Sequence, residues 1–132
     1  MPYEFYLESE NEQRMFTPET LKEMEQYLKN VPHYKVDDKF YCIFKNQAQK
    51  DVAIPYIVSS IAKKENVYIY SSIGFSPTSI MISVVGDNEV DRYLYDFVVW
   101  CQKRYPCQLY ELSEPVPPED LLDDEEEIPL IN

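Results

Sequence analysis

The residues best suited to catalysis in this sequence are one histidine and three cysteines. A hydrolytic nucleophile needs a base within hydrogen-bond reach and a donor group for the developing oxyanion. His33 follows Val31 and Pro32, which is typical of a solvated loop rather than of a catalytic base. Residues 73–76 lack the glycine and serine spacing of a nucleophile elbow. The sequence therefore indicates no catalytic residue and predicts that the chain is not an enzyme.

Residue spacing also disfavours nucleotide and metal sites. Neither Gly74 nor Gly86 belongs to a glycine pattern that binds phosphate. Adjacent carboxylates such as Asp37 and Asp38 could hold a hard divalent cation, but no EF-hand spacing is present. Acids in loops and at helix starts are more often caps or solvated surface. We therefore expect neither a cofactor nor a metal site.

Net charge is the most informative property of the sequence. The 132 residues carry 24 acidic and 12 basic side chains, a formal net charge of −12. Such a field repels nucleic acid and anionic membranes and attracts basic surfaces. No basic residue follows Arg104, and eight acids lie between positions 114 and 127, so residues 1–112 carry only four excess acids. We therefore expect a basic protein partner and a strongly acidic C-terminal segment.

The spacing of the cysteines and the hydropathy of the sequence indicate the cellular compartment of the protein. Cys42, Cys101 and Cys107 are odd in number and too widely spaced for a paired-cysteine motif, which favours buried free thiols in a reducing compartment. The first ten residues are acidic where a signal peptide would be basic, and no apolar stretch reaches membrane-spanning length. These patterns predict a cytoplasmic protein.

The first half of the chain should supply two strands and a helix. Residues 3–7 alternate between apolar and polar types, as a half-buried strand does. Thr17 and Pro18 form a helix start, and the helix should run to about residue 30. Residues 39–45 are apolar on both faces, which predicts a central strand.

The middle of the chain is harder to assign. Residues 55–64 have helical spacing with Pro55 in the first turn, although their β-branched content leaves a strand as the rival assignment. Residues 67–72 and 78–85 read as two strands, and Gly74 lies in the connection between them.

The longest helix should begin at Asp87 and end near residue 105. A rotation of about 100° per residue places an apolar set on one face and puts Tyr95 and Val99 on the far side. Residues 107–112 should form the last strand, after which prolines and acids should end regular structure. The predicted core positions of the helix are Val90, Leu94, Phe97, Val98 and Cys101.

These elements follow one another in the order β-α-β-α-β-β-α-β. The order predicts a single domain of class α/β or α+β, with one mixed sheet of about five strands and two or three helices packed on it. We place the globular domain at residues 1–112 and an acidic, proline-rich tail at residues 113–132.

Tyrosines and the tail are the features best suited to binding. Twelve tyrosines are many for this length, and tyrosine serves both core packing and protein interfaces. The tail places Leu121, Leu122 and residues 128–131 beside its acids, which suits docking on a surface, its own or a partner's. The candidate partner-binding residues are Tyr68, Tyr70, Tyr95, Val99, Asp123, Asp124, Glu125, Glu126 and Glu127.

The sequence therefore predicts a small acidic protein that binds another protein. Its most concrete form is a stoichiometric inhibitor, of the immunity-protein or antitoxin type, acting on a basic or nucleic-acid-acting partner. The alternative is a regulatory or assembly module, acting as a homodimer or an adaptor. An enzyme that uses carboxylates and tyrosines would require a deep pocket of acids with strongly raised pKa values. We expect a monomer or homodimer that binds neither nucleic acid nor membrane.

Because neither a disulfide nor a metal should support the core, reducing agent and chelator should leave stability unchanged. We expect the melting temperature in dithiothreitol or EDTA to match that in plain buffer. Thermal unfolding followed by circular dichroism tests this, and a drop of several degrees in either reagent would contradict it.

Overall fold

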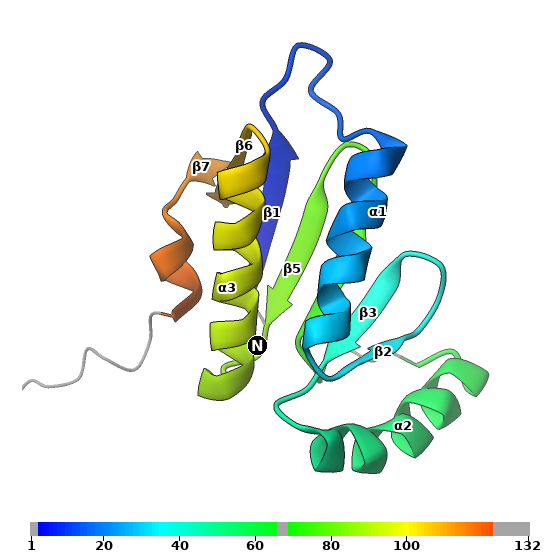
Figure 1. The fold of residues 1–132 in the computed structure, drawn as a ribbon. Coiled ribbons are helices and arrows are strands. Elements are labelled where there is room, and N and C mark those ends of the chain that lie inside the picture. Colours follow the sequence, from blue (N-terminus) through cyan, green and yellow to red (C-terminus); the bar gives the residue numbers. More distant parts are fainter. Residues whose placement is uncertain (1–2, 66–68, 123–132) are drawn as a thin grey trace, which may run out of the picture.

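The structure is a computed structural model that describes residues 3–65 and 69–122 (Figure 1). Within those ranges it contains seven strands, three α-helices and two short 3-10 helices. In chain order these are β1 (Tyr3–Ser9), α1 (Pro18–Tyr27), η1 (Leu28–Asn30), β2 (His33–Lys35), β3 (Phe40–Ile43), α2 (Gln47–Ala62), β4 (Ser72–Phe75), β5 (Ile80–Val84), α3 (Asn88–Arg104), β6 (Cys107–Glu111), β7 (Glu114–Pro115) and η2 (Pro118–Leu122).

The strands form one sheet in the order β2-β3-β4-β5-β1-β6-β7. Every strand pair in the described residues is antiparallel, so the fold is α+β and the expected mixed sheet is corrected to an antiparallel one. The expected five strands become seven because β2 and β7 span three and two residues, too short for an alternating pattern. The expected central strand is confirmed, since β3 lies between β2 and β4.

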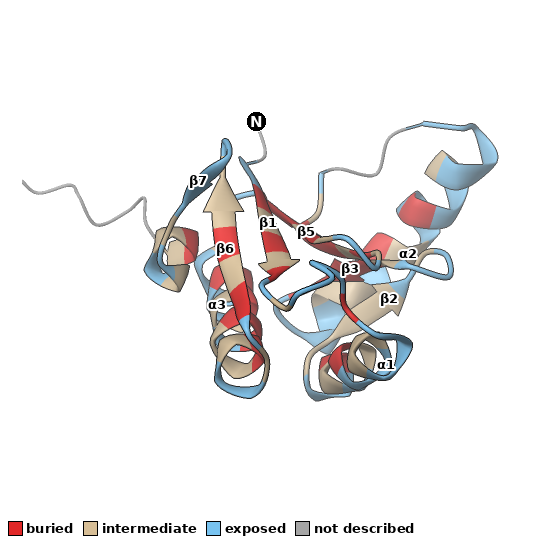
Figure 2. Cartoon of the chain, turned by 90° about the horizontal axis from the view of Figure 1, so that it is seen from above, coloured by how far each residue is buried: buried red, intermediate tan, exposed pale blue. Residues whose placement is uncertain are grey.

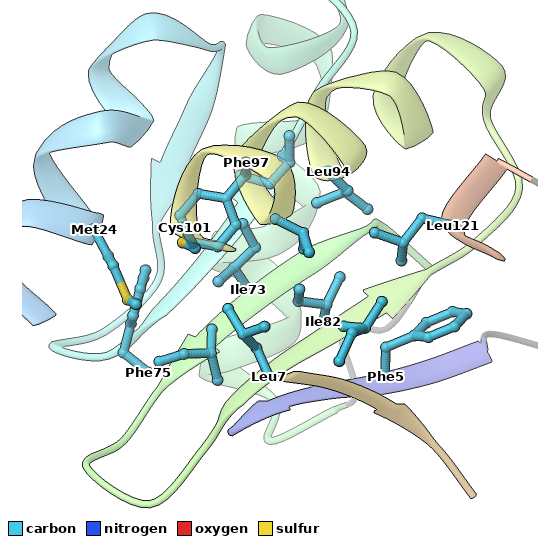
Figure 3. Close-up of a cluster of buried hydrophobic side chains, with 14 of the residues drawn as sticks. Phe5, Leu7, Met24, Ile73, Phe75, Ile82, Leu94, Phe97, Cys101 and Leu121 are labelled. Atoms are coloured by element: carbon cyan, nitrogen blue, oxygen red, sulfur yellow. The ribbon is translucent and has the colours of Figure 1, made fainter. Parts of the chain in front are cut away.

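Alternation along β1 divides the sheet into two faces. Phe5 and Leu7 are buried, and they lie opposite Ile82 and Ile80 of the neighbouring strand β5. Leu7 also lies opposite Leu109 of β6 on the other side. Figure 3 shows Phe5, Leu7 and Ile82 meeting the side chains of α3, and Ile80 and Leu109 belong to the same apolar cluster. The intervening residues of β1 therefore point to the opposite face.

Helices α3 and α1 cover the first face of the sheet side by side (Figures 1 and 2). The Asp87 carboxylate caps α3, accepting hydrogen bonds from the backbone N–H groups of Glu89 at 3.0 Å and Val90 at 3.2 Å. Tyr27 of α1 packs its ring 5.6 Å from that of Phe97 in α3. All five positions predicted as the core face of α3 are buried, namely Val90, Leu94, Phe97, Val98 and Cys101.

Helix α2 packs on the second face, at the end of the sheet formed by β2 and β3. Its buried residues Ala53 and Ile57 form a small cluster with Cys42 and Phe44. The helical assignment of this segment is confirmed, but the helix begins at Gln47, and Pro55 lies in its interior. Asn46 provides the start by accepting a hydrogen bond from the Gln49 N–H at 2.8 Å.

Two sequence expectations about connections are wrong. The strand expected near residues 67–72 begins only at Ser72; Gly74 lies inside β4, and the turn to β5 falls at residues 76–79 instead. Residues 67 and 68 lie outside the described residues. Regular structure also continues past Leu112, because β7 extends the sheet and η2 inserts Leu121 into the main core.

The two sides of α3 should differ in how much they contribute to stability. Phe97→Ala and Leu94→Ala should each lower the free energy of unfolding by about 2–5 kcal/mol, because both side chains are fully buried. Val99 is half-buried, and Val99→Ala should lower it by less than about 1 kcal/mol. Urea denaturation of the three variants measures the difference, and equal losses at positions 97 and 99 would contradict it.

Candidate functional site

The second face of the sheet is covered only in part. Helix α2 covers it at β2 and β3, whereas β1 and β6 lie away from that helix (Figure 2). On these two strands the outward side chains are directly paired: Tyr6 lies opposite Tyr110, and Glu8 lies opposite Gln108. All four are half-buried. The uncovered surface is therefore aromatic and acidic rather than apolar.

A hollow of about 770 Å³ opens on this surface. Three tyrosines, three glutamates, one arginine and a turn line it, and we call it the tyrosine–glutamate hollow. Its lining residues are Tyr3, Glu4, Tyr6, Glu8, Arg14, Tyr110, Glu111, Leu112 and Ser113. Three carboxylates against one guanidinium leave the lining with two excess negative charges, so the hollow attracts cations.

Local hydrogen bonds hold the lining in place. The Tyr6 hydroxyl donates to Glu4 Oε1 at 3.1 Å, which fixes a carboxylate beside an aromatic ring. The Asn11 side chain bridges the loop after β1, donating to the Met15 carbonyl at 2.7 Å and accepting from the Met15 N–H at 3.1 Å. This loop turns at Arg14, whose φ of 57° is left-handed, and presents that side chain to the hollow.

The rim of the hollow contains a strained turn. Leu112 and Ser113 join β6 to β7 as a two-residue hairpin loop, with φ angles of 52° and 67°. Asparagine and glycine are the residues that favour this geometry, and a branched side chain in the left-handed region is disfavoured. Leu112 is also 88% exposed, the most exposed large apolar residue among those described. The backbone conformation of Leu112 is unfavourable, and its side chain is exposed to solvent. These two features are typical of a side chain that contacts another molecule rather than one that stabilises the fold.

The residues selected from sequence lie elsewhere. Tyr70 is half-buried beneath α2, with its ring 5.6 Å from that of Phe44, and desolvation raises the pKa of its hydroxyl. Tyr95 is half-buried beside η2 and donates a hydrogen bond to Glu119 Oε2 at 3.5 Å. Val99 is half-buried one turn further along α3. Tyr70 therefore lies near α2, and Tyr95 and Val99 lie on α3. None of the three lines the hollow. Tyr68, Asp123, Asp124, Glu125, Glu126 and Glu127 lie outside the described residues.

Sequence reasoning missed most of the hollow. Tyr6 and Tyr110 were both expected in strands, but the sequence contains no signal that pairs the first strand with the last expected one. Glu4 contacts Tyr6 within β1, but only the pairing with β6 brings Tyr110 and Glu111 to the same surface. The alternation along β1, which sends its acids to one face, is the signal that could have indicated an acidic surface.

None of the three cysteines, nor His33, lines the hollow. All three cysteines are free and buried, which confirms the expectation from sequence. Burial raises the pKa of the Cys42 and Cys107 thiols to about 12, so neither is a thiolate near neutral pH. His33 places Nδ1 2.9 Å from the Val31 carbonyl oxygen. Within residues 3–65 and 69–122, no three His, Cys, Asp or Glu side chains are grouped to hold a metal.

Comparisons with protein-family models, with curated proteins and with solved structures found no match to this chain. No helix in the described part of the chain combines the length and apolar character needed to cross a membrane. The hollow and the acidic charge of the chain are therefore the features that bear on function.

Relieving the strained turn should stabilise the fold. The double variant Leu112→Asn, Ser113→Gly places residues that favour left-handed φ in the loop, and we expect the free energy of unfolding to rise by about 1–2 kcal/mol. Urea denaturation measures the gain. The matched control Met15→Asn alters another exposed apolar residue, in the loop between β1 and α1, and should change stability by less than about 0.5 kcal/mol. An unchanged or lowered stability in the double variant would contradict the assignment of strain.

Proposed function

We propose that this protein is a stoichiometric inhibitor that binds a basic or nucleic-acid-acting protein and blocks its active surface. The observation that carries the proposal is the tyrosine–glutamate hollow, which gathers aromatic anchors and carboxylates on the part of the second face that α2 leaves uncovered. A surface built for phosphate presents lysine and arginine side chains. These would meet Glu4, Glu8 and Glu111 in the hollow.

In this proposal, charge mainly sets how fast the partner associates, and the aromatic contacts mainly set how slowly it dissociates. The net charge of −12 speeds the encounter with a cationic partner, and that effect is screened beyond about 8 Å at physiological salt. Long-lived binding requires desolvated anchors, which typically contribute about 2 kcal/mol or more each at the centre of an interface. Tyr6, Tyr110 and the exposed Leu112 supply such anchors next to the carboxylates. The hollow therefore contributes to both association and dissociation rates.

The contact extends beyond the hollow in our proposal. Residues 123–127 add five acids that steer the encounter, and Tyr68, Tyr70, Tyr95 and Val99 form secondary contacts. We also propose that the protein works in the cytoplasm, which is supported by three cysteines that are all free. A reducing compartment keeps such thiols unpaired.

The test is affinity capture with the tagged chain in lysate of its native cell, followed by purification of the captured protein and surface plasmon resonance. The triple variant Glu4→Gln, Glu8→Gln, Glu111→Gln should reduce the association rate constant by about tenfold, because it removes the negative charge of the hollow. Wild type should inhibit the captured protein at a molar ratio of one to one.

A charge-matched control separates the hollow from net charge. Glu19→Gln, Glu65→Gln, Glu89→Gln removes the same three charges from exposed positions outside the hollow. It should slow association by no more than about twofold. Equal slowing by both variants, or a captured partner without a basic surface, would contradict the proposal. So would a partner whose activity is unchanged at saturating inhibitor.

A further inference from the structure

The carboxylates of the tyrosine–glutamate hollow have no cationic partner among the described residues. Glu4, Glu8 and Glu111 line the hollow, and no described lysine or arginine forms an ion pair with any of them. Arg14 lines the hollow as well, but its guanidinium is not paired with these carboxylates. The Tyr6 hydroxyl donates to Glu4 Oε1 at 3.1 Å, which holds one carboxylate beside an aromatic ring. The hollow therefore presents a tyrosine–carboxylate pair to which the described part of the chain supplies no cation.

At the C-terminal end of α3, a similar tyrosine–carboxylate pair binds an arginine. The Tyr105 hydroxyl donates to Glu23 Oε1, and Arg104 Nη2 lies 3.4 Å from the same oxygen. The Arg104 guanidinium also lies over the Tyr105 ring, with Cζ 5.8 Å from the ring centroid. One guanidinium therefore contacts both members of the pair, the carboxylate and the ring.

A second arginine of α3 also combines an acid with an aromatic ring. Arg92 Nε lies 3.7 Å from Asp96 Oδ1, and Arg92 Cζ lies 5.5 Å from the centroid of the Tyr95 ring. Two arginines of this chain thus use the same combination of an ion pair and a ring contact.

A lysine beside another tyrosine–carboxylate pair makes only one of these contacts. The Tyr41 hydroxyl donates to Glu25 Oε1, and Lys35 Nζ lies 5.9 Å from the centroid of the Tyr41 ring. Lys35 and Glu25 form no ion pair. An ammonium group is a compact point charge, whereas a guanidinium is a planar fork that stacks on a ring while it donates to a carboxylate. These contacts within the chain favour arginine over lysine as the cation that fits the hollow.

We propose that the hollow binds an arginine side chain of the inhibited partner. Its guanidinium pairs with the Glu4 carboxylate and stacks on the tyrosine rings of the hollow, where Tyr6 and Tyr110 lie opposite each other. Glu8 and Glu111 attract the neighbouring cations of the same basic surface. The inference rests on the proposed function for the identity of the partner, but the preference for arginine can be measured without that partner.

Isothermal titration calorimetry of the full chain with capped hexa-arginine and hexa-lysine peptides tests the proposal at about 150 mM NaCl. The two peptides carry the same charge, so the net charge of the chain attracts both to a similar extent. Wild type should bind hexa-arginine about tenfold more tightly than hexa-lysine. The variant Glu4→Gln, Glu8→Gln, Glu111→Gln should reduce this ratio to about twofold or less. Tyr6→Leu should also reduce the ratio, because it removes a ring and the hydroxyl that holds Glu4.

Two control variants remove the same groups outside the hollow. Glu19→Gln, Glu65→Gln, Glu89→Gln removes three charges, and Tyr56→Leu removes an exposed tyrosine of α2. Both controls should keep the wild-type ratio of the two affinities. An arginine preference that survives in the triple hollow variant, or that falls equally in the controls, would place the arginine contact elsewhere and overturn the proposal.

The outcomes also separate this inference from the proposed function. Equal affinities of wild type for the two peptides would overturn the arginine preference and leave the inhibitor proposal standing, because a partner with lysines would satisfy it. An arginine preference that depends on the hollow supports the inference even if the protein captured from lysate is not inhibited, and that result would contradict the proposed function alone.

Discussion

Strand β1 connects the two halves of the sheet, since it pairs with β5 on one side and with β6 on the other. Its alternation sends Phe5 and Leu7 into the core and Glu4, Tyr6 and Glu8 to the opposite face. A slip of one residue in either pairing would place carboxylates against α3, which disfavours every register shifted by an odd number of residues. The same alternation that fixes the register therefore also creates the acidic wall of the hollow.

The placement of the helices decides how much of the second face stays open. Helix α3 is tied to α1 at its C-terminal end, where Tyr105 and Arg104 both donate hydrogen bonds to the Glu23 carboxylate. The Tyr105 hydroxyl lowers the pKa of Glu23, with a smaller contribution from Arg104. Because η2 also packs on α3, the helical layer lies largely on one face. Among the described helices, only α2 reaches the other face, and its two buried side chains cover one edge of it.

Local signals in the sequence predicted the elements that depend on local physics. A cap at Asp87 and an apolar period of 3.6 located α3, and two apolar faces located β3 as a central strand. The start of α2 was missed because the cap at Asn46 precedes a polar stretch without apolar periodicity. The hollow was missed for another reason: strand pairing joins residues about a hundred positions apart, as in Tyr6 and Tyr110, and no local pattern encodes that. Tyr70 and Tyr95 were selected by type, whereas their contacts with Phe44 and Glu119 depend on tertiary packing.

Charge in this chain is segregated rather than uniform, and that bears on how a basic partner would approach it. The hollow and residues 123–127 are negative, whereas residues 35–64 contain six lysines and three aspartates. A basic partner is therefore attracted to one part of the molecule and repelled from another. The charge distribution thus favours an encounter in which the hollow faces the partner.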